Sequence, residues 1–171
     1  MFFSISSSDY NKTLANISRV KVHLRTGIIE VLDNHQDLLG NVENDFVEVE
    51  TISDNKKESF SFVLQEGIFI VSTKGLEEEP AKRLGTTIYI YARRIEELNS
   101  QFSFDAIVKE YEEKLRKTEE LRQKQKKFLE FAKENPESTL QFISGTKLAL
   151  LESEVKFLEK LITIQKKGFR P

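Results

Sequence analysis

The sequence predicts an α+β fold in which an N-terminal antiparallel β-sandwich is followed by a C-terminal antiparallel two-helix hairpin. Three observations predict it: apolar and polar residues alternate through the first ninety or so residues, no proline or glycine occurs from Ser103 to Glu134, and a second helical pattern follows Asn135-Pro136. A period of two indicates half-buried strands, whereas spacings of three and four indicate helices. We therefore assign residues 1–99 to the sandwich and residues 100–171 to the hairpin.

The strands are marked by apolar residues at every second position. Val20, Val22 and Leu24 alternate with charged or polar residues, and the pattern recurs at Val47/Val49, Phe60/Phe62/Leu64 and Ile88/Ile90. Turn-forming pairs separate these segments, at Thr26-Gly27, Asp33-Asn34, Asn44-Asp45, Asp54-Asn55 and Glu66-Gly67. Many short strands with such turns favour an antiparallel sandwich. A charged segment with a proline, at about residues 74–85, breaks the pattern and is interpreted as an insertion.

The helical half contains two long periodic segments. Ser103 is a plausible N-cap for the first helix, and Asn135-Pro136 stops it because the residue before proline avoids the α region. The second helix runs to about Lys167, before Gly168. Each arm is expected to be about 45 Å long. Four i,i+4 ion pairs are predicted, namely Glu110/Lys114, Glu112/Arg116, Glu113/Lys117 and Glu120/Lys124.

The second helix carries an apolar seam with 3-4-3-4 spacing, formed by Leu148, Leu151, Val155, Leu158 and Ile162. Such a seam needs a partner helix. It can face the first helix, a neighbouring subunit or both, and packing within the chain is the default. Gly145 lies inside this helix, where it costs about 1 kcal/mol relative to alanine.

Composition excludes several function classes. The 171 residues include 26 basic and 28 acidic side chains, so a net charge of -2 provides no attraction to nucleic acid or to an anionic membrane. Zero cysteines exclude disulfides, thiolate nucleophiles and Cys-ligated zinc, and agree with a reducing, cytoplasmic setting. The first residues do not form a signal peptide, and no apolar run approaches the ~18 residues that span a bilayer. We expect no direct membrane insertion.

Motifs for chemistry are missing from the sequence. No P-loop pattern occurs, and Gly145-Thr146-Lys147 has no second glycine. His35 after Asp33-Asn34 is better explained as a turn residue than as a base, and His23 is expected to be solvated on the polar face of its strand. Consecutive glutamates at 77–79 lack the spacing of a calcium loop. We therefore expect no catalytic residues, nucleotide-binding residues, metal or cofactor.

Three segments together resemble the epsilon subunit of F-type ATP synthases. The stretch Ile17 to His35 reads strand, Thr-Gly, short strand and Leu-Asp-Asn-His, similar to the family's strand, [ST]-G, short strand and L-P-[NG]-H, with Asp33 in place of proline. Gln65 to Ile70 resembles the family's G-G-F segment, with Glu66 and Ile68 as departures. Phe104-Asp105 stands where the family begins its helices with I-D.

This resemblance implies a non-catalytic rotor subunit in the central stalk of a rotary ATPase. The sandwich is expected to dock beside a gamma-like shaft, and the hairpin to reach an alpha/beta-like head, with mechanical coupling as its role and inhibition of ATP hydrolysis as a further option. The family's loop that approaches the membrane rotor ring, or a replacement for that ring, corresponds to Thr26, Gly27, Ile28, Ile29 and Glu30, and we add His35 as a candidate contact. An ordinary β-turn explains these residues equally.

The resemblance also implies a location, which is the inner face of the cell membrane, reached through the complex. The insertion at 74–85 and a long hairpin depart from the family and suggest a modified assembly. In style, the chain is similar to divergent sequences of wall-less bacteria, some of which have extra ATPase-like motors, including one associated with gliding.

A reading from another class remains open: a β-sandwich adaptor with a coiled-coil arm, unrelated to ATPases, that dimerises through Leu151, Val155 and Leu158. The rotor subunit is expected to be a monomer bound to a gamma-like coiled coil. Sizing of the purified chain separates the two.

The resemblance generates one binding prediction. Some members of the family bind ATP through I-D-x-x-R-A at the start of the first helix, and this chain reads Phe104-Asp105-Ala106-Ile107-Val108-Lys109, without the arginine and the final alanine. We expect isothermal titration calorimetry on the purified chain to detect no ATP binding. A micromolar dissociation constant would contradict this.

Overall fold

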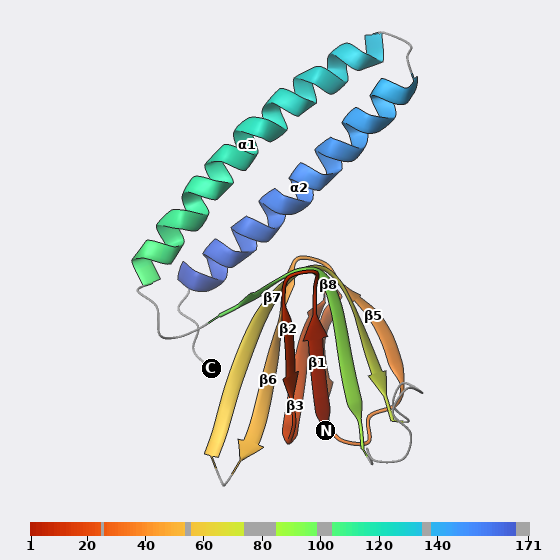
Figure 1. The fold of residues 1–171 in the computed structure, drawn as a ribbon, viewed down its shortest axis with the longest axis vertical. Helices are drawn as coiled ribbons and strands as arrows, with labels where there is room; N and C mark the ends of the chain where they lie inside the picture. Colours follow the sequence, from red (N-terminus) through yellow and green to blue (C-terminus); the bar gives the residue numbers. More distant parts are fainter. Residues whose placement is uncertain (25, 54–55, 74–84, 99–103, 135–137, 167–171) are drawn as a thin grey trace. The chain divides into compact units, whose positions relative to one another are not determined.

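The computed structural model describes residues 1–24, 26–53, 56–73, 85–98, 104–134 and 138–166 (Figure 1). The chain divides into two compact units, Met1–Ser100 and Gln101–Arg170. Within the described residues, the first unit contains eight strands and the second contains two helices, which confirms the predicted fold class. The predicted N-cap Ser103, the break at Asn135-Pro136, the end at Lys167-Gly168 and all of the predicted insertion except Gly85 lie outside the described residues.

The strands of the first unit form one sheet. They are β1 (Phe2–Ser6), β2 (Asn11–Leu14), β3 (Ile17–Leu24), β4 (Gly27–Val31), β5 (Leu38–Val42), β6 (Asp45–Ser53), β7 (Lys56–Ser72) and β8 (Thr87–Glu97). Their order is β2-β1-β8-β7-β6-β3-β4, and β5 pairs with β7. Every pair is antiparallel except β1 with β8, which is parallel.

The long strand β7 folds this sheet into two layers. Its first half pairs with β6, from Ser53↔Lys56 to Asp45↔Leu64, and its second half pairs with β5, from Val42↔Gly67 to Leu38↔Val71. Between the halves, Glu66 has a φ of 50°, and the side chains that face the core change from even positions such as Leu64 to odd positions such as Phe69. A strand that switches layers at such a bend is how a two-layer sheet turns a corner.

One core fills the space between the layers. Val20, Val22, Val47 and Val49 reach it from one layer, and Phe3, Ile5, Phe69, Val71, Ile88 and Ile90 reach it from the other. The rings of Phe3 and Phe62 stack across it with centroids 6.0 Å apart. The residues predicted from alternation to be buried are therefore in the core, which confirms the period-two interpretation of these strands.

The second unit is a closed antiparallel hairpin of α1 (Phe104–Glu134) and α2 (Ser138–Lys166) (Figure 1). Polar contacts join the helices at several levels: Gln125 Nε2 donates to the Ser144 carbonyl (3.3 Å), Gln141 Nε2 donates to the Ala132 carbonyl (3.1 Å), and Lys166 pairs with Glu112 (2.6 Å). Together they fix the level of one helix against the other along most of their length.

The ion pairs of α1 differ in part from the prediction. Glu110–Lys114 and Glu113–Lys117 form as expected. Arg116, however, pairs with Glu113 and Glu120 on its two sides, because guanidinium offers several donors in a fixed fork. Glu112 pairs with Lys166, and Lys124 has no ion pair among the described residues. The predicted pairs Glu112/Arg116 and Glu120/Lys124 are therefore wrong.

The contact between Gly40 and Phe69 generates a stability prediction. The two residues are directly paired in the β5–β7 ladder, and a Cβ at Gly40 would lie 2.2 Å from Phe69 Cε1, in a ring that is fully buried. Gly40→Ala should lower the unfolding free energy by about 1–3 kcal/mol in urea unfolding, because the ring has no room to move. Phe69→Leu in the same chain should restore part of the loss.

Gly145→Ala is the matched control, since a Cβ there meets nothing within 4 Å. In α2 this change should raise stability by up to about 1 kcal/mol. If Gly40→Ala is as stable as the wild type, the proposed contact does not constrain the fold.

Candidate docking surfaces

The predicted rotor-loop residues lie along the strand pair β3–β4 and beyond its far end. Thr26 and Gly27 form the connection, Gly27 has a φ of 144°, and Ile28 is 61% exposed. Ile29 packs against the core, and the Glu30 carboxylate pairs with Arg19 at 3.2 Å. Thr26, Gly27, Ile28 and Glu30 are all exposed, and Ile28 is the large apolar side chain among them.

His35 lies beyond the opposite end of β4 from the Thr26–Gly27 turn. The four steps from Gly27 to Val31 span about 13 Å, so the structure does not bring His35 together with the exposed turn. Its backbone N–H donates to the Leu32 carbonyl at 3.2 Å, and its Nδ1 lies 2.8 Å from the Gln36 carbonyl. These are the contacts of a turn residue.

Asp33 holds the end of β4 against the start of β8. Its carboxylate accepts hydrogen bonds from the backbone N–H groups of Thr86 (3.3 Å) and Asn34 (3.1 Å). The hydrogen bond from Thr86, followed by that from Asn34, lowers the pKa of Asp33. At this position the aspartate thus caps two backbone N–H groups, a role that proline does not fill.

The expectation for His23 is wrong. Its ring stacks on Phe46 with centroids 3.6 Å apart, and its Nε2 lies 3.8 Å from a Glu48 carboxylate oxygen. A cross-strand aromatic neighbour covers the ring, so the side chain is half-buried, although it does lie on the polar face of its strand.

A second surface, which we call the outer-face patch, consists of Leu39, Ile68, Ile70, Tyr89 and Tyr91. The strand register places these residues in two rows on the side of β5, β7 and β8 that faces away from the core: Leu39↔Ile70↔Tyr89, and Ile68↔Tyr91 beside Asn41. Leu39 is 69% exposed, and Ile68 and Tyr91 are each about half exposed. A shallow groove of about 340 Å³ is lined by Leu39 and Ile70 together with Asp37, Leu38, Val71 and Ser72.

A contiguous apolar patch of this kind is typical of interaction sites, whereas single exposed apolar residues are not. The outer-face patch was not predicted. Its signal in the sequence is the run Ile68-Phe69-Ile70-Val71, which is apolar at four consecutive positions and therefore on both faces of the strand.

A half-buried polar cluster ties the edge strand β2 to the end of β8. The Glu97 carboxylate accepts hydrogen bonds from Tyr10 Oη (2.5 Å) and Lys12 Nζ, and the same ammonium lies over the Phe60 ring at 4.3 Å from its centroid. Burial raises the pKa of Glu97, but the hydrogen bonds from Lys12 and Tyr10 outweigh it and leave that pKa below its ordinary value. Burial and the Glu97 carboxylate also raise the pKa of Tyr10.

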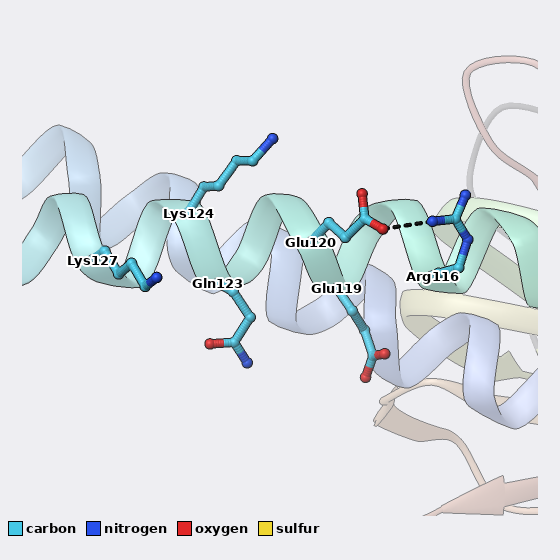
Figure 2. A pocket seen from close by; sticks show the side chains of 6 residues that line it. All are labelled: Arg116, Glu119, Glu120, Gln123, Lys124 and Lys127. Carbon is cyan, nitrogen blue, oxygen red and sulfur yellow. Dashed lines mark hydrogen bonds and ion pairs between the residues drawn. The ribbon is translucent and has the colours of Figure 1, made fainter.

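The predicted seam residues of α2 lie on its less exposed side. Val155 is 2% exposed, Leu158 1% and Ile162 8%, whereas Leu148 and Leu151 are half-buried. A hollow on α1 is lined by Arg116, Glu119, Glu120, Gln123, Lys124 and Lys127 (Figure 2). Charges of both signs from a single helix line it, so it resembles an ordinary solvated helix surface more than a ligand site.

The described residues contain no group of three or more metal-ligating side chains, and neither described helix is long and apolar enough to cross a membrane.

Comparisons with known proteins give structural similarity only. No protein family model and no curated protein matches the chain. The Euglena gracilis mitochondrial ATP synthase structure (OSCP/F1/c-ring, rotational state 1) contains a chain that matches with 14% identity and a TM-score of 0.48, covering 94% of this chain and 78% of that one. A chain in the Tetrahymena thermophila mitochondrial ATP synthase central stalk/c-ring structure matches with 12% identity and a TM-score of 0.41, covering 60% and 73%.

The Glu97 cluster generates a pH prediction. Glu97→Gln should lower the unfolding free energy at pH 7 by about 1–2 kcal/mol, because two hydrogen bonds to a charged, half-buried acceptor are weakened. Since the folded-state pKa of Glu97 lies below its ordinary value, the contribution is complete above about pH 5 and is lost as the pH falls through the folded pKa. Urea unfolding should therefore show the difference from wild type shrinking between about pH 5 and pH 3.

Glu96→Gln serves as the control, because it removes only the Arg94–Glu96 pair at 2.8 Å, within one strand. Its effect should be under about 1 kcal/mol. A Glu97→Gln deficit that stays constant from pH 7 to pH 3 would show that the carboxylate charge plays no part.

Proposed function

We propose that the chain is a non-catalytic central-stalk subunit of a rotary F-type or F-type-like ATPase, which couples a gamma-like shaft to the base of the rotor. The observation that carries the proposal is the order of its modules: a two-layer antiparallel sheet comes first and a closed helical hairpin second, as the resemblance to the epsilon subunit implies. Regulation of ATP hydrolysis through the hairpin is part of the same proposal, and so is a cytoplasmic place at the inner face of the cell membrane.

The two surfaces of the sandwich suit two different partners. The outer-face patch offers apolar and aromatic side chains across three adjacent strands, which is the composition of a stable protein interface. We assign it to the gamma-like shaft. The turn at Thr26–Gly27 offers one exposed apolar side chain, Ile28, next to the Glu30–Arg19 pair. It suits the smaller contact that the rotor ring, or its replacement, would make.

The adaptor alternative is less well supported. It requires Leu151, Val155 and Leu158 to meet a second copy, but Val155 and Leu158 are already buried within a single chain. A dimer through them would have to expose these side chains first. Sizing of the purified chain at several concentrations should therefore show a monomer.

The first test is affinity purification of the tagged chain from its native cells, with mass spectrometry of the co-purifying proteins. Alpha-, beta- and gamma-like ATPase subunits are expected with the wild type. Leu39→Asp/Ile68→Asp should reduce the gamma-like subunit at least about tenfold, because two carboxylates would be buried without partners at the interface.

Ile28→Asp is the control, since it makes the same kind of substitution once, at an exposed apolar residue outside the outer-face patch. It should keep the gamma-like subunit and weaken only the rotor ring contact. Circular dichroism of each variant establishes that the sheet is intact. If folded wild type purifies with no ATPase subunit at all, the proposed function is wrong.

A further inference from the structure

The hairpin exposes a row of large apolar side chains that its own seam does not use. We call these residues the tip face: Leu121, Phe128 and Phe131 on α1, and Ile143 and Leu150 on α2. Leu121 is 54% exposed and Phe131 63%, and the other three are a little under half exposed. Together they expose on the order of 400 Å², within the range of the largest apolar patches on monomers, which are often functional.

These residues lie on one side of the hairpin. The least exposed positions of each helix recur at spacings of three and four and form the seam, for example Arg122 and Leu129 on α1 and Ser144 and Leu151 on α2. Each tip-face residue comes one position before a seam residue, and each is therefore turned about 100° from the seam. Because the helices are right-handed and antiparallel, this rotation turns the tip-face residues of both helices toward the same side of the hairpin.

The contacts between the helices set the level of these residues along the hairpin. Because Gln125 bonds to Ser144 and Gln141 to Ala132, Leu121 lies about level with Leu150, and Phe128 with Ile143. The tip face is thus a shallow apolar track with residues from both helices at two successive levels.

Two lysines lie between these levels on the same side. Lys124 and Lys147 are both exposed, and neither has an ion pair among the described residues. Figure 2 shows Lys124 projecting from the opposite side of α1 to Glu119 and Gln123. The track therefore consists of apolar side chains separated by two ammonium groups that form no ion pair within the described part of the chain.

We propose that the tip face binds an amphipathic α-helix of another protein, whose apolar stripe is flanked by aspartates or glutamates. Apolar residues one heptad apart on such a helix would cover the two levels, and its carboxylates would meet Lys124 and Lys147. Helix-in-groove recognition uses this arrangement of anchors. The hairpin stays closed in this mode, because the hydrogen bonds of Gln125 and Gln141 lie in the seam and not on the tip face.

Charge argues against two other occupants. A second copy of the chain would bring four lysines together at the centre of the interface, which is destabilising. An anionic membrane is bound by clusters of several basic residues, whereas this chain has a net charge of -2. The proposal rests on the hairpin alone and does not depend on the proposed function.

The test uses the full chain and two stapled helical peptides of about 20 residues, which carry leucines at heptad positions a and d and either glutamates or lysines on both flanks. Fluorescence anisotropy should show binding of the glutamate peptide and at least about tenfold weaker binding of the lysine peptide. Lys124→Glu/Lys147→Glu should invert this preference, and Phe128→Ser/Leu150→Ser should abolish binding of both peptides.

Lys126→Glu/Lys156→Glu is the matched control, because it makes the same charge change at exposed positions outside the tip face. It should keep the preference for the glutamate peptide. Equal binding of the two peptides, or no binding of either by folded chain, overturns the proposal. The proposal is also wrong if the glutamate peptide fails to bind while the chain associates with phosphatidylglycerol vesicles, or with itself on sizing, and Phe128→Ser/Leu150→Ser removes that association.

Discussion

The sandwich depends on the reversal of side-chain facing in the middle of β7. Side chains alternate along a strand, so one strand can serve the core from both layers only if the alternation shifts by one residue. Glu66 makes this shift with a left-handed φ of 50°, which is unfavourable for a residue with a side chain. Its exposed pair with Arg93, at 3.4 Å, contributes little. Burial of Phe69 and Val71 beyond the bend must therefore offset the strain.

The same reversal creates the outer-face patch. Once Phe69 and Val71 face inward, Ile68 and Ile70 must face outward, next to Tyr89 and Tyr91 of β8. The core of the second layer and the candidate interface are thus two faces of one short strand segment. The Glu97 cluster acts at the other end of β8, where it holds the edge strand β2 through Lys12 and Tyr10. Because the patch lies on strands held by the core and by the Glu97 cluster, little conformational entropy should be lost when a partner binds it.

Local patterns predicted the fold class, the core positions such as Val20 and Val47, and the two helices, because burial on one face imposes a period that is visible in the sequence. Long-range pairing was not predictable in this way. Three features join residues that are distant in sequence or on neighbouring strands. They are the parallel β1–β8 pair, the ion pair of Glu112 with Lys166 in place of the predicted Arg116, and the stacking of His23 on Phe46. To predict the outer-face patch, one would need the register of three strands. To predict the tip face, one would need to know which residues of the two helices lie at the same level.

The pairing of Gly40 with Phe69 has a consequence for evolution. Since neither residue can change alone without a clash or a void, the two positions should vary together among descendants of the same ancestor. We expect a small residue on β5 opposite a phenylalanine on β7, followed by a helical hairpin, to persist as a two-site signature when overall identity has decayed. Sequences too divergent for pairwise detection can be screened for this covariation, which would extend the lineage of the fold.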